Sequence, residues 1–164
     1  SEAFLVLRAQ DVGLTLRYMP LVLIVMNVAY TATAYPAGVA ADQFNQRMLL
    51  IVGLGVLAVA DLVLAATTSP LLALAGASLW GIHMGLTQGL FAKLVADNAP
   101  LELRGTAFGI FNLVSGSALL LASVIAGALW AAFGAPATFL AGAAFAILTV
   151  LGLLAYRRKA QAVL

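Results

Sequence analysis

The chain reads GTAFGIFNLVSGSALLLASVIAGALWAAFGAPATFLAGAAFAILTVLGLLAY over residues 105–156, without one Asp, Glu, Lys or Arg. A helix that crosses a bilayer needs about 20 apolar residues, so this stretch is long enough for two such helices. The tetrapeptide FGAP at residues 133–136 divides it, because clusters of Gly and Pro mark turns. The stretch predicts membrane-spanning helices at residues 105–132 and 136–156.

Two more charge-poor runs precede this stretch. Residues 18–41 carry no formal charge, and residues 48–92 carry only Asp61. The turn-like sequence TTSP at residues 67–70 breaks the second run. The runs predict three further spans, at residues 18–40, 48–67 and 71–96.

The composition is typical of a membrane protein. Hydrophobic residues make up 64% of the chain and charged residues 9%, and the mean hydropathy is +1.10. A soluble domain has roughly 45 to 50% apolar and about 25% charged residues. Pro20 and Pro36 lie near the ends of the first span, where a missing N–H does least damage, so we predict one helix there instead of two shorter pieces. We expect an all-α, polytopic transmembrane bundle of about five helices, without the alternation of a β-barrel.

Basic residues divide unevenly between the two sides of this predicted bundle. Positive loops stay in the cytoplasm, so we expect a cytoplasmic basic tail at residues 157–164 and an external segment at residues 1–17, after a helix that precedes this sequence. We expect the membrane to be the inner (plasma) membrane of a bacterium. The external side has Arg8 and Arg17, and the cytoplasmic side has Arg47, Lys93, Arg104, Arg157, Arg158 and Lys159.

The most specific pattern lies between the first two spans, where residues 38–47 read GVAADQFNQR. This pattern resembles the loop signature G-x-L-A-D-R-x-G-R-R of the major facilitator superfamily. Asn45 can adopt the left-handed conformation that the glycine of the signature supplies. Gly38, Ala41, Asp42 and Arg47 match the signature, and Ala40, Gln43, Asn45 and Gln46 depart from it.

A second resemblance follows at residues 97–109, DNAPLELRGTAFG. This segment looks like the link between the tenth and eleventh helices of such transporters, which has an acid, a proline and then Glu-x-Arg-Gly. The two links together imply helices eight to twelve of a twelve-helix secondary transporter, a partial C-terminal domain that follows the end of helix seven. The resemblance implies alternating access, with the N-terminal half of the same transporter as the missing partner.

Charged residues of the two links lie at one membrane face, where they can pair and interact with helix ends. We expect them to latch one conformational state of the transporter. The alternative is that they are solvated loop charges that only follow the topology rule. The latch residues are Gly38, Asp42, Arg47, Asp97, Glu102 and Arg104.

Polar residues within the spans must face protein or water, because an unsatisfied polar group in hydrocarbon is costly. They occur on the first, third and fourth spans, which the resemblance places around the central cavity. We expect an unidentified small-molecule substrate to contact them. The candidates are Asn27, Tyr30, Thr31, Trp80, His83, Thr87, Gln88, Asn112 and Ser115.

Two titratable residues lie within the spans. His83 is the only histidine and falls near mid-membrane, where it either couples transport to a proton gradient or packs through a hydrogen bond. Asp61 is the one acid inside an apolar run. It either binds a coupling proton or lies at the interface, paired with an Arg of the external segment.

Glycines recur every four residues on the third span, at Gly81, Gly85 and Gly89. Small residues at this interval let two helices approach closely. We predict a packing contact, with a contact that moves during alternating access as the alternative. The fourth span has a similar set, Gly105, Gly109, Gly116, Ser123 and Gly127.

Several classes of function lack their motifs. The chain has no cysteine and one histidine, so we expect no metal site. It has no P-loop and no Gly-x-Ser-x-Gly nucleophile elbow, which argues against ATP-driven transport and hydrolase activity. We expect no cofactor, no enzyme activity and no nucleic-acid partner; the basic tail anchors the topology at the lipid bilayer. The leading prediction is proton-coupled export of small amphipathic molecules. Transport of sugars or other metabolites, and a membrane subunit without transport activity, remain as alternatives.

Overall fold

The computed structural model describes residues 2–161, with side chains described through residue 155. Within residues 2–161 the chain is helical and contains no strand. Five helices are long and apolar enough to cross a membrane, which confirms the predicted all-α bundle. The elements are α1 (Ala3–Asp11), η1 (Leu16–Tyr18), α2 (Met19–Gln43), α3 (Gln46–Ala66), α4 (Pro70–Asn98), η2 (Leu101–Leu103), α5 (Arg104–Phe133) and α6 (Ala135–Gln161).

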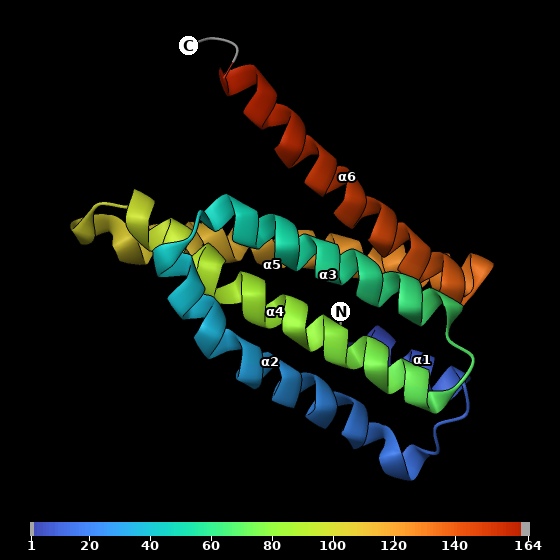
Figure 1. Cartoon of the computed structure of the whole chain (residues 1–164). Coiled ribbons are helices and arrows are strands. Elements are labelled where there is room, and N and C mark those ends of the chain that lie inside the picture. Colours follow the sequence, from blue (N-terminus) through green and yellow to red (C-terminus); the bar gives the residue numbers. More distant parts are fainter. Residues whose placement is uncertain (1, 162–164) are drawn as a thin grey trace.

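Helix α4 is the centre of the packing. It lies between α2 and α3, and α3 in turn packs against α6 (Figure 1). Helix α5 contacts α6 and, less extensively, α4, and it buries no residue. Figure 1 also shows α6 leaning away from the other helices toward its C-terminal end. The bundle therefore has a tight part, made of α2, α3 and α4, and a looser part, made of α5 and α6.

The bundle has two ends with different links. We call the end with the α2–α3 and α4–α5 links the Asp42 end. The opposite end carries α1 and the α3–α4 and α5–α6 links, and we call it the Arg8 end (Figure 1). The main buried cluster lies toward the Arg8 end, where α1 packs against α2 and α4. The cluster consists of Leu5, Ala9, Val22, Met26, Leu64, Ala65, Ala73, Ala77 and Phe139.

The predicted glycine contact is confirmed at two of its three positions. A Cβ on Gly81 would overlap the backbone carbonyl of Met26, and a Cβ on Gly85 would lie 2.9 Å from the carbonyl oxygen of Tyr30. Both glycines therefore let α4 approach the backbone of α2 closely. Gly89 meets nothing within 4 Å, and the same is true of the glycines on α5.

The first link is shorter than the sequence predicts. Helix α2 is continuous from Met19 to Gln43 and contains Pro36 in its interior, so Gly38 and Asp42 lie on the helix. The prediction that Asn45 adopts the left-handed conformation is wrong, because its φ is −62° and its ψ is 116°. Its side chain instead accepts a hydrogen bond from the Arg47 N–H at 2.9 Å and caps the start of α3. An N-cap thus occupies the position where the family signature has glycine.

Candidate functional site

A charged cluster joins α2 and α4 at the Asp42 end. Lys93 Nζ lies 2.8 Å from Asp42 Oδ1 and 3.9 Å from Asp97 Oδ2. Gln46 Nε2 donates to Asp97 Oδ2 at 3.3 Å, which adds α3 to the cluster. Both carboxylates are exposed, so water and salt screen these contacts. The structure thus brings Asp42 and Asp97 together through Lys93, which the sequence alone assigns only to one side of the membrane.

The other residues of the expected latch lie around this cluster or outside it. Arg47 lines the hollow beside the cluster, together with Asp42 and Lys93. Glu102, in η2, and Arg104, at the start of α5, are exposed, and neither forms an ion pair within the described side chains. A signal for Lys93 was present in the sequence, because Asp97 follows it by four residues and such pairs meet on a helix surface.

The polar candidates on α2 and α5 are exposed in this structure. Asn27 Nδ2 donates to the Leu23 carbonyl of its own helix at 2.8 Å. Thr31, Asn112 and Ser115 are exposed and make no hydrogen bond within the described side chains. The packed part of the bundle does not cover these side chains. They are therefore free to meet a substrate, water or another segment of protein. Tyr30 is half-buried beside them.

The polar candidates on α4, which are Trp80, His83, Thr87 and Gln88, have different surroundings. His83 Nδ1 lies 2.8 Å from the Gly53 carbonyl oxygen on α3, so this nitrogen is the donor. Thr87 is buried on the same side and donates to the carbonyl of His83 at 2.9 Å. His83 and Thr87 thus belong to the α3–α4 contact, which matches the packing alternative for this histidine. Gln88 is exposed, and Trp80 lines a separate cavity.

This cavity lies between α3, α4, α5 and α6 and has a volume of about 570 Å³. Its lining is mostly apolar and includes Trp80, Phe139 and Phe145. Asp61 is the only ionisable residue in the lining. The side chain of Asp61 faces Gly142 of α6, and the residue is 2% exposed. Asp61 Oδ1 has no hydrogen-bond partner within the described side chains.

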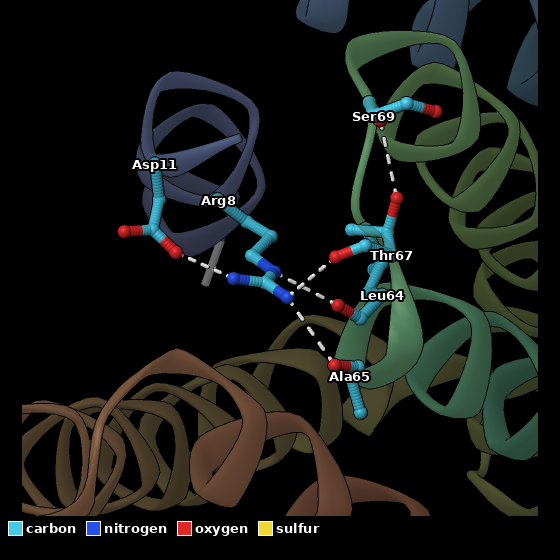
Figure 2. A network of polar contacts seen from close by, with 6 residues as sticks. All are labelled: Arg8, Asp11, Leu64, Ala65, Thr67 and Ser69. Atoms are coloured by element: carbon cyan, nitrogen blue, oxygen red, sulfur yellow. Dashed lines mark hydrogen bonds and ion pairs between the residues drawn. The ribbon is translucent and has the colours of Figure 1, made fainter. Parts of the chain in front are cut away.

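The prediction that Asp61 pairs with an arginine of the external segment is wrong, because no such ion pair occurs among the described residues and Arg8 is engaged elsewhere. Figure 2 shows the Arg8 guanidinium reaching from α1 to the end of α3. It donates to the carbonyls of Leu64 at 2.9 Å, Ala65 at 3.2 Å and Thr67 at 2.9 Å. Arg8 also pairs with Asp11 at 2.5 Å and is 6% exposed.

The Arg8 contacts have a clear physical reason. The last carbonyls of a helix lack partners within the helix, and they carry the negative end of its dipole. A guanidinium has five donors in a fixed fork, so it can serve several carbonyls at once. Arg8 therefore ties α1 to the α3–α4 link. Sequence reasoning missed this role because backbone acceptors leave no mark in the sequence.

Within the described residues no group of three His, Cys, Asp or Glu side chains could hold a metal ion.

A sequence model of the Major Facilitator Superfamily matches residues 3–163, which is almost the whole chain. The chain belongs to the major facilitator superfamily. The family that the sequence analysis predicts from the two links is thereby confirmed.

One curated member of the superfamily also matches. It is an uncharacterized MFS-type transporter of Methanocaldococcus jannaschii, 31% identical over 160 residues. The alignment covers 94% of this chain and 40% of that relative, so the chain spans less than half the length of the relative. No solved structure matches the chain significantly. Family membership and five apolar helices together identify an integral membrane protein of a transporter family.

Proposed function

We propose that this chain forms helices eight to twelve of a secondary transporter that works by alternating access. The central substrate site would then lie between this part and an N-terminal half of the same protein. The proposal is supported by family membership and by the greater length of the matched relative. Secondary transporters built from repeats bind substrate near the bilayer midplane, between the repeats.

The observation that carries this proposal is the exposure of polar side chains on α2 and α5. Thr31, Asn112 and Ser115 lie within apolar helices and are exposed. A polar group facing lipid in mid-membrane is costly, so such groups face protein or a water-filled path. Helices α2 and α5 therefore line the substrate path in the complete transporter, with Asn27 on the same surface of α2.

The transported substrate is a small amphipathic molecule, exported in exchange for protons across the inner membrane of a bacterium. The C-terminus lies in the cytoplasm, so the Asp42 end is the cytoplasmic end. Asp61 is the best-placed proton carrier, because it is a buried acid in an otherwise apolar span. His83 is less suited to that role, since its Nδ1 is bonded to the α3 backbone. The neutral polar residues of α2 and α5 favour a second candidate, transport of a sugar or another neutral metabolite.

The cluster at the Asp42 end is proposed to latch one conformational state. Lys93 holds Asp42 of α2 and, more distantly, Asp97 of α4. A screened, exposed contact is strong enough to bias an equilibrium and weak enough to break in each transport cycle. In this proposal Lys93 is the central cation of the latch.

A pair of α5 variants tests the transport proposal. In the complete transporter reconstituted into liposomes, Asn112→Leu should lower substrate flux at least severalfold, because it removes a polar group from the substrate path. Ser117→Ala is the matched control, since Ser117 is exposed on the same helix but donates to its own Leu113 carbonyl at 2.8 Å. Equal flux from both variants and the unaltered protein would contradict the placement of α5. Absence of any flux, with every substrate class tried, would favour a subunit without transport activity.

A further inference from the structure

Asp61 is the most unusual polar group in the membrane-spanning part of the chain. It is 2% exposed, and its Oδ1 atom has no hydrogen-bond partner within the described side chains. An ionised carboxylate without a partner is very costly in an apolar environment. The carboxylate therefore needs a positive partner or a proton. The structure offers space for such a partner beside it, in the cavity that it lines.

Neither arginine of the external segment pairs with this carboxylate, and Arg17 is exposed and lies over the Tyr18 ring. Arg8 donates to three backbone carbonyls at the end of α3 and pairs with Asp11 (Figure 2). The donors of Arg8 are thus already used. Glu2, which precedes α1, is itself an acid and is exposed.

The membrane-spanning helices around Asp61 supply none either. On α4, His83 is bonded through Nδ1 to the α3 backbone. Every other charged side chain of α3, α4 and α5 lies near the Asp42 end. Helix α6 has no ionisable residue over residues 135–155. Any positive partner of Asp61 other than a proton must therefore come from outside the described residues.

The cavity beside Asp61 has the size and lining of a small-molecule site. Its volume of about 570 Å³ falls within the range of about 300 to 1,000 Å³ that is usual for ligand pockets. Apart from Asp61, the lining is dominated by aliphatic side chains and by the aromatic rings of Trp80, Phe139 and Phe145. Aromatic faces attract organic cations, and aliphatic walls accept their hydrocarbon groups. One acid in an apolar pocket matches one positive charge on an apolar molecule.

Gly142 maintains the space around the carboxylate. A Cβ at this position would overlap the Asp61 side chain. Any larger residue would displace the carboxylate from its place between α3 and α6. The glycine therefore lets the acid sit at the wall of the cavity, where a ligand can reach it.

We propose that Asp61 and this cavity bind an amphipathic organic monocation, with the positive group of the ligand against the carboxylate and its apolar body against the aromatic wall. This inference rests on the proposed export function and names the substrate class that it serves. The site lies within this one helical bundle, and α5 lines it as well as the proposed substrate path. A proton and the organic cation compete for the same carboxylate, so binding weakens as the pH falls.

The experiment measures equilibrium binding of radiolabelled tetraphenylphosphonium to the complete transporter in detergent. Tetraphenylborate, which has the same shape and the opposite charge, is the matched ligand control and needs no variant. The protein variants are Asp61→Asn, which keeps the shape of the side chain, and Glu2→Gln, which removes an exposed acid that precedes α1. Size-exclusion profiles verify that each variant is folded.

The proposal expects saturable binding of the cation, weaker at low pH, and no saturable binding of the anion. Asp61→Asn should weaken cation binding by about 30-fold or more, as expected when one member of a desolvated charge pair is removed. Glu2→Gln should bind like the unaltered protein. Equal binding of the two ions, or cation binding unchanged in Asp61→Asn, would overturn the proposal. Cation binding that is unchanged in Asp61→Asn is also expected if lipid or another segment of the complete protein fills the cavity.

Binding in detergent does not require transport, so the two proposals fail separately. If the protein transports substrate and the Asp61→Asn variant still binds the cation, the proposed site is wrong and the export function stands. If cation binding depends on Asp61 and the protein never transports, the export function is wrong and the site stands.

Discussion

Replacing Arg8 with Met should lower the free energy of unfolding by about 3 kcal/mol. The guanidinium donates to three carbonyls at the end of α3, and Arg8 is 6% exposed. Hydrogen bonds to a charged group contribute about 1.5 to 3 kcal/mol each, so three of them amount to about 4.5 kcal/mol at the low end. Water that reaches the freed carbonyls reduces the loss to about 3 kcal/mol. The ion pair with Asp11 adds little, because the Asp11 side chain is 52% exposed.

The assay is unfolding of the complete transporter by SDS titration, followed by far-ultraviolet circular dichroism. Arg17→Met is the matched control, since Arg17 loses the same charge from an exposed position at the same end of the bundle. Its effect should stay within about 0.5 kcal/mol. Arg8→Lys should fall between the two, because an ammonium lacks the planar fork that reaches three carbonyls. A loss for Arg8→Met no larger than that for Arg17→Met would refute the assignment of Arg8 as the tie between α1 and the α3–α4 link.

Two further predictions concern helix packing and the latch. Gly81→Ala and Gly85→Ala should each destabilise the protein by about 1 to 3 kcal/mol, because the added Cβ meets the α2 backbone. Gly89→Ala should be neutral or stabilising, because its Cβ enters open space. The same SDS titration measures all three variants, and equal effects would contradict the α2–α4 contact. Lys93→Gln should change the rate at which a cysteine placed at position 31 or 112 is labelled from either side of the membrane, without lowering expression. Arg104→Gln should leave that rate unchanged, because Arg104 forms no ion pair within the described side chains. Identical labelling in both variants would contradict the latch.

Helix placement was predictable because hydropathy is a local property. The gaps between charged residues located all five spans, and the four-residue spacing of Gly81 and Gly85 indicated a close helix contact. The helix ends were less predictable. Helix α2 continues past Pro36 to Gln43, and α4 continues to Asn98. Both helices thus extend beyond their apolar runs into the polar residues that follow. The limits of an apolar run therefore do not mark the ends of a helix.

The polar contacts were mostly not predictable, since they depend on the tertiary fold. Arg8 binds carbonyls almost sixty residues away, and backbone acceptors are the same at every position. The partner of Asp42 proved to be Lys93, which lies 51 residues further along the chain. Asn45 was recognised as special, but its role is an N-cap and not a left-handed turn. The sequence identified which residues were unusual and could not say which atoms they would meet.

The most direct test of the account compares substrate flux by the complete transporter with flux by residues 1–164 alone, both reconstituted into liposomes with an imposed proton gradient. The central claim is that these helices provide one side of a substrate path whose other side belongs to an N-terminal half. It predicts gradient-driven flux by the complete protein and none by residues 1–164, even when both are inserted at equal amounts. Flux by residues 1–164 at a comparable rate would contradict it.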